Sequence, residues 1–169
     1  MSLSRTIALF ERVVIFMAAL GGVLVLIQMV WISYGVFTRY AMNAPDRMVT
    51  EATALLLFPV AFAGLAYALR EDAYPRVTML TDRFGPDARK GFALLNMGLM
   101  LAVGLFFSLA AIKATMGAFK SGASSEILLW PRYAFWAPGA AALVLFSIYA
   151  ALRFARLVVT PARDLKSEI

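Results

Sequence analysis

The side chains that most often carry catalysis or bind metals are scarce in this chain. It contains no histidine and no cysteine, which removes the commonest general base, the usual axial ligand of a membrane haem, and the thiolates of disulfide exchange and iron–sulfur clusters. Serines are present, but a serine nucleophile needs a base to activate it. The sequence therefore predicts no enzyme, no cofactor and no metal site.

Polar groups that could act inside a membrane are equally few. A carrier coupled to protons or cations normally holds an ionisable side chain in the membrane interior, where it binds and releases the charge. The apolar stretches offer only Gln28, Asn96 and scattered hydroxyl groups. Gln28 is expected to hydrogen-bond across a helix interface, and such bonds contribute about 0.6–2 kcal/mol. We expect a structural role for these stretches rather than transport through them.

The chain contains four apolar stretches without charged residues, and these must position any functional side chains. Each approaches the roughly 20 residues that cross about 30 Å of hydrocarbon as a helix. With the 62% hydrophobic composition, they predict an all-α membrane protein in which residues 1–169 form a single four-helix transmembrane domain. The first stretch is too long for the apolar part of a signal peptide, so we treat it as a retained span. The predicted spans are 13–36, 52–69, 91–112 and 133–152.

The basic residues predict the orientation of these spans. Most of the 16 Lys and Arg precede the first span, follow the fourth, or lie between the second and third. By the positive-inside rule, both termini and the middle connector are cytoplasmic. The formal charge of +6 is thereby explained as a topology signal, and no nucleic acid partner is expected. All three tryptophans fall near the outer ends of spans, where they are expected to contact lipid headgroups.

The first connector is predicted to end at a capped helix start. Thr50 is a possible N-cap of the second span, and Glu51 suits the positive N-terminal end of that helix. Arg47 lies four residues before Glu51, a spacing that favours a local ion pair. Glu51 is therefore expected to act as a structural residue at the start of the second span.

The middle connector is predicted to contain a short amphipathic helix. Pro75 suits the first position of a helix, and apolar side chains follow it at Val77, Leu80 and Phe84, which share one helix face. We expect this segment to lie in the cytoplasmic membrane interface.

Small residues predict close helix packing. In the second span, Ala61, Gly64 and Ala68 form a stripe that lets another helix backbone approach, and Ala18 with Gly22 makes a shorter version in the first span. The spacing leaves open whether these residues join helices of this chain or contact a partner.

Several short motifs occur in order between residues 10 and 155. They are Arg39-Tyr40; Asn43, Pro45 and Glu51; Gly64-Leu-Ala-Tyr-Ala-Leu-Arg70; Arg76-Val-Thr-Met-Leu-Thr-Asp-Arg83; Pro131; and Pro138-Gly139. In this order, and with this chain size and four spans, they resemble the small membrane subunit (DctQ-like) of tripartite ATP-independent periplasmic (TRAP) transporters. The chain departs from the family at Tyr74, where relatives often have histidine, and at Thr78, where they often have aspartate.

The resemblance implies a secondary transporter of three parts in the bacterial inner membrane. A periplasmic substrate-binding protein would deliver an organic acid to a large multi-span subunit that moves it with sodium ions, and this chain would be the scaffold. Membrane lipids would surround the complex. The expected interface with the large subunit comprises Ala61, Gly64, Ala68 and Gln28. The expected docking residues for the binding protein are Arg39, Asp46, Arg47, Glu126 and Arg132.

Two other functions fit the same size and span number. A self-contained four-span exporter would need a carboxylate within the membrane, and Glu51 is the only nearby candidate. A membrane anchor of another complex would need no such group, and the pattern of spans alone does not separate it from a transporter subunit.

Overall fold

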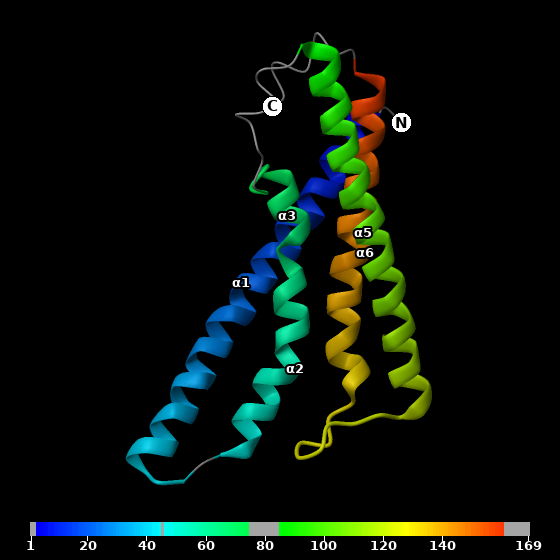
Figure 1. Ribbon diagram of the computed structural model, residues 1–169. Helices are drawn as coiled ribbons and strands as arrows, with labels where there is room; N and C mark the ends of the chain where they lie inside the picture. The colour runs from blue at the N-terminus through cyan, green and yellow to red at the C-terminus, as the bar shows by residue number, and fades with distance from the viewer. Residues whose placement is uncertain (1–2, 45, 75–84, 161–169) are drawn as a thin grey trace.

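The computed structural model describes residues 3–44, 46–74 and 85–160, which are almost entirely helical and contain no strand. The four apolar elements are α1 (Leu3–Ala41), α2 (Arg47–Ala63) continued by α3 (Leu65–Arg70), α5 (Pro86–Ser121) and α6 (Arg132–Val159), shown in Figure 1. Each is long and apolar enough to cross a membrane, which confirms the predicted all-α membrane fold. The predicted amphipathic helix from Pro75, and Thr78 with it, lie outside the described residues.

The helices extend beyond the predicted spans. α5 continues past Ile112 to Ser121, so Lys113 and Lys120 lie on the helix rather than in a connector. It ends at Gly122, whose φ of 64° is the left-handed conformation that glycine adopts without strain. With 36 residues, α5 is about 54 Å long, which exceeds the hydrocarbon thickness of about 30 Å. The helix must therefore tilt or project from the bilayer.

The helices form an open row. α1 packs along α2 and α3, these pack on α6, and α6 pairs extensively with α5, so α1 and α5 are the two edges. The start of α1 and the end of α6 lie at one end of the molecule, which we name the terminal end (Figure 1). Residues 42–44 after α1 and the connection 122–131 lie at the other end, the loop end.

Each edge helix buries one narrow seam. The buried residues of both seams recur every seven positions, the period that keeps one face of a helix against its neighbour in left-handed packing. Most of the remaining apolar surface of α1 and α5 is exposed, as expected for helices that face lipid or a partner. The residues of this repeat are Ile7, Val14, Gly21 and Gln28 on α1, and Met97, Gly104, Ala111 and Ala118 on α5. Thr38 of α1 and Ser108 of α5 are buried as well.

The largest buried cluster lies toward the terminal end and joins four elements. Val14 of α1, Leu69 of α3, Met97 of α5 and Tyr149 of α6 all belong to it. A smaller cluster lies closer to the loop end, where Phe58 and Phe62 of α2 pack against Leu143 of α6 and Ala111 of α5. Apolar packing thus joins the helices toward both ends of the row, and polar contacts add to it at the loop end.

Candidate functional site

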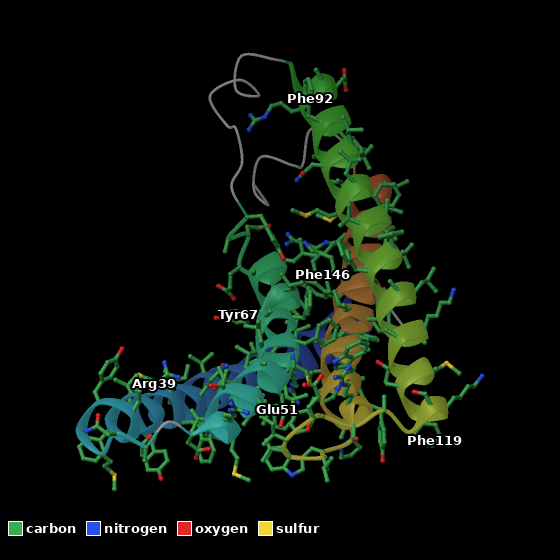
Figure 2. The ribbon with its side chains drawn as sticks, turned by 60° about the horizontal axis from the view of Figure 1, so that its bottom comes forward. Arg39, Glu51, Tyr67, Phe92, Phe119 and Phe146 are labelled. Carbon is green, nitrogen blue, oxygen red and sulfur yellow. The ribbon has the colours of Figure 1, made fainter. Side chains whose placement is uncertain are left out.

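The predicted docking charges gather at the loop end. Because α1 ends there, α2 and α6 begin there, and the 122–131 connection lies between α5 and α6, all five predicted residues share this end of the molecule (Figure 2). Arg39, Arg47 and Glu126 are exposed, and Asp46 and Arg132 are half-buried.

The start of α2 is capped by an aspartate. Asp46 has extended backbone angles, and its Oδ1 accepts a hydrogen bond from the Met48 N–H at 2.8 Å. Aspartate is a preferred N-cap because its oxygen satisfies a helix N–H that has no partner within the helix. The prediction that Thr50 caps this helix was therefore wrong, since α2 begins at Arg47 and Thr50 lies within it.

The carboxylate of Glu51 binds the backbone of a distant loop. Its Oε1 accepts from the Glu126 N–H at 2.6 Å and the Ile127 N–H at 3.0 Å, and its Oε2 accepts from Ile127 at 3.1 Å and from the Leu128 N–H at 2.6 Å. Successive N–H groups that converge in this way form an anion-binding concavity. The ion pair predicted between Arg47 and Glu51 is not found among the described residues.

The connection that Glu51 binds is also closed on itself. The Ser125 N–H donates to the Trp130 carbonyl at 2.9 Å, the Trp130 N–H donates to the Ser125 Oγ at 3.1 Å, and the Arg132 N–H donates to the Ala123 carbonyl at 3.0 Å. Leu129 has a positive φ of 54°, which turns the chain back toward α6. Figure 2 shows Glu51 on α2 beside this connection, with Arg39 on α1.

A groove of about 320 Å³ opens between α1 and α2 at the loop end. Arg39 and Asp46 contribute one cation and one carboxylate, and Ile32 and Val36 provide apolar wall. In residues 3–44, 46–74 and 85–160, no group of three or more acidic side chains is placed to hold a metal ion.

Gln28 lies inside the contact between α1 and α2. It is buried, and its Nε2 donates to the Thr53 carbonyl at 3.1 Å. The predicted hydrogen bond across a helix interface is confirmed, and both of its partners belong to this chain. Gln28 is buried, whereas Ala61 and Gly64 are exposed.

The small-residue face of α2 and α3 is left uncovered. Ala61 and Gly64 are exposed, and Ala68 is half-buried. α2 ends at Ala63, one residue before Gly64, and a Cβ added to Gly64 would meet no atom within 4 Å. Residues 3–44, 46–74 and 85–160 therefore do not pack against this face at Gly64.

Arg153 at the terminal end was not singled out by the sequence. Its guanidinium donates to the Leu69 carbonyl at 2.5 Å and to the Asp72 Oδ1 at 2.9 Å, and so joins α6 to the end of α3. Tyr74 donates its hydroxyl to the Leu65 carbonyl at 3.0 Å, and burial raises the pKa of this phenol. Tyr74, the departure from the resembled family, has a structural contact in this chain.

Comparison with protein families matches residues 28–160 to the family described as "Tripartite ATP-independent periplasmic transporters, DctQ component". The match begins within α1, covers the loop end and all later helices, and spans most of the chain. No curated protein and no solved structure matches the chain.

Proposed function

Because the chain belongs to the DctQ family of tripartite ATP-independent periplasmic transporter components, we propose that it is the scaffold for a large multi-span subunit that takes up organic acids with sodium ions. The family match carries this proposal. The four charge-free stretches support it, since a scaffold needs no ionisable group within the membrane. The Glu51 carboxylate that an exporter would require is engaged by backbone N–H groups, which argues against that alternative.

The proposed interface with the large subunit is the face of Ala61, Gly64 and Ala68. Small side chains allow helix backbones to approach closely in a membrane, where packing and not the hydrophobic effect drives association. Exposure at Ala61 and the empty space around Gly64 leave room for a partner helix. Gln28 would contribute from behind this face, by fixing α1 against α2.

Substitution of Gly64 with leucine tests the interface. We expect Gly64→Leu to reduce co-purification of the large subunit by at least about tenfold, because the larger side chain would hold the partner helix away. Folding of the chain itself should be preserved, since no atom of the described residues lies within 4 Å of a Cβ placed at Gly64. Gly22→Leu is the matched control, because Gly22 also has empty space around it. Wild-type co-purification of Gly64→Leu would exclude this face.

We further propose that the loop end faces the periplasm of a bacterial inner membrane and docks the substrate-binding protein. Both termini would then be cytoplasmic. Arg39, Arg47 and Arg132 supply cations on this surface, and Asp46 and Glu126 supply carboxylates. A mixed charged surface gives a docking protein orientation and a faster encounter rate.

Charge reversal tests the docking surface. Replacing Arg39 and Arg47 together with glutamate should lower uptake by at least about tenfold at limiting binding protein, since like charges would replace attractive contacts. The measurement is substrate uptake into proteoliposomes that contain the assembled complex. The control reverses Arg12 and Arg156, exposed cations toward the terminal end of α1 and α6. Undiminished uptake by the Arg39 and Arg47 variant, with assembly intact, would contradict the docking role.

A further inference from the structure

The contact between Glu51 and the 122–131 connection is not explained by the membrane fold alone. A carboxylate at the edge of a span is ordinarily stabilised by water or by a nearby cation. Glu51 has neither an ion pair with Arg47 nor one with another described residue. Its two oxygens are instead engaged by three successive N–H groups, at distances of 2.6 to 3.1 Å.

Among the described residues, the hydrogen bonds of Glu51 are the polar contact between the 122–131 connection and α2. Within the connection, hydrogen bonds join Ser125 to Trp130 and Ala123 to Arg132, which close its base. The N–H groups of residues 126–128 take no part in that closure, and they donate to Glu51. Without the carboxylate, this stretch would have no described hydrogen bond to another helix.

The position of Glu51 links two parts of the docking surface. Arg47 lies four residues before Glu51 at the start of α2, and Asp46 lies five residues before it. Glu126 is on the segment that it binds, and Arg132 follows at the start of α6. Direct packing of α2 on α6, with Phe58 against Trp136, sets where the start of α6 and Arg132 lie. The Glu51 contact sets where Glu126 lies relative to Asp46 and Arg47.

We propose that Glu51 is a positioning residue for docking of the substrate-binding protein. Its carboxylate holds the 122–131 connection on α2, so that Glu126 meets the binding protein in one fixed arrangement with Asp46 and Arg47. This inference rests on the proposed function. It assigns to Glu51 no contact with substrate, sodium ions or the binding protein itself.

The test uses Glu51→Gln in the complete transporter complex. Glutamine keeps the size of the side chain, but it replaces one acceptor oxygen with an NH₂ group that would face backbone N–H donors. Glu71→Gln is the matched control, because Glu71 is an exposed glutamate at the end of α3 that pairs with Arg70. Glu51→Asp keeps the charge on a shorter side chain, and it serves as the second variant if Glu51→Gln fails to assemble.

Two measurements are made on each variant. Hydrogen exchange of the amides of residues 126–128 should accelerate at least about tenfold in Glu51→Gln, since one of their two acceptor oxygens is replaced by a donor group. In proteoliposomes, the concentration of substrate-loaded binding protein that gives half-maximal uptake should rise at least about threefold, while the maximal rate stays within about twofold. Glu71→Gln should match the wild type in both, and Glu51→Asp should fall between the wild type and Glu51→Gln.

The outcomes separate this inference from the proposed function. If the wild-type chain does not co-purify with a large subunit, or its uptake does not depend on the binding protein, the proposed function fails. If the wild type behaves as proposed and exchange is unchanged in Glu51→Gln, the inference is overturned. Faster exchange with an unchanged half-saturating concentration also overturns it, because the connection would then be held without serving docking. A fall in maximal rate alone would place the effect in transport, and overturns it as well.

Discussion

Two adjacent glycines on α1 have different surroundings. A Cβ added to Gly21 would lie 2.6 Å from the Cβ of Ala63 on α2, whereas one added to Gly22 would meet nothing within 4 Å. Carbon atoms in contact are ordinarily about 3.5–4 Å apart. Because the Ala63 Cβ is attached directly to the backbone, it cannot rotate away. The spacing of α1 and α2 therefore depends on the absence of a side chain at Gly21.

Substitution of Gly21 with alanine should destabilise the protein. Overpacking of this kind costs about 1–3 kcal/mol, so we expect Gly21→Ala to lower the midpoint of thermal unfolding in detergent. Gly22→Ala is the control, and it should leave the midpoint unchanged or raise it, since alanine is favoured over glycine in helices by about 1 kcal/mol. Equal midpoints for the two variants would show that α1 and α2 are not in close contact here.

Residues at the start of α2 show the limit of local sequence reasoning. Thr50 and Glu51 were interpreted from their neighbours alone, and both the cap and the ion pair with Arg47 were wrong. Asp46 was available as a cap four residues earlier, where preference rules also favour it. The partners of Glu51 are 75 to 77 residues away in the chain. No spacing rule along one helix predicts that contact, because it depends on how the first turns of α2 meet the 122–131 connection.

At the scale of elements, Arg153 joins two helices outside the main cluster. It binds the carboxylate of Asp72 and the Leu69 carbonyl near the end of α3, where helix carbonyls lack partners within the helix. The guanidinium matches a carboxylate with two parallel donors, which a lysine ammonium cannot reproduce. This geometry predicts that a lysine at position 153, although it keeps the positive charge, does not reproduce the contact that Arg153 makes.

A double-mutant cycle tests the pair. We expect Arg153→Lys and Asp72→Asn each to lower the free energy of unfolding in detergent, with a coupling of about 1 kcal/mol between them, because both side chains remain partly exposed to solvent. The cycle supplies its own control, since effects unrelated to the contact add. Strict additivity of the two substitutions would contradict the assigned interaction.

The spans could be predicted because hydrocarbon thickness fixes the length of a charge-free helix. Their true ends could not, since a helix continues wherever its backbone remains hydrogen-bonded, as α5 does from Ile112 to Ser121. The buried seam of α1 was also hidden in the sequence. Nearly every neighbour of Gly21 and Gln28 is apolar, so hydrophobicity has no period that marks one face. The sequence predicted close helix packing at Gly22, but it is Gly21 that lies against Ala63 of α2.

At the scale of the whole molecule, the row of helices explains why the chain suits a scaffold. A closed bundle would bury its own small and polar residues against each other. Here α1 and α5 are edges with one buried seam each, and the face of α2 and α3 at Gly64 is uncovered. Such a row has enough internal contact to keep its order and leaves long apolar surfaces for lipid or another subunit. The polar contacts of Glu51 and Arg153 then fix its two ends.

The orientation of the row is open to a direct test, since the chain has no cysteine. A single cysteine at Ser124, an exposed residue of the 122–131 connection, should react with a membrane-impermeant maleimide in intact spheroplasts. A single cysteine at Ala73, exposed after α3, should react only after the membrane is permeabilised, because the positive-inside rule places that end in the cytoplasm. The two sites control for each other. The reverse pattern would place the loop end in the cytoplasm, where a periplasmic binding protein cannot reach Arg39 or Glu126, and both the docking proposal and the role of Glu51 in it would fail together.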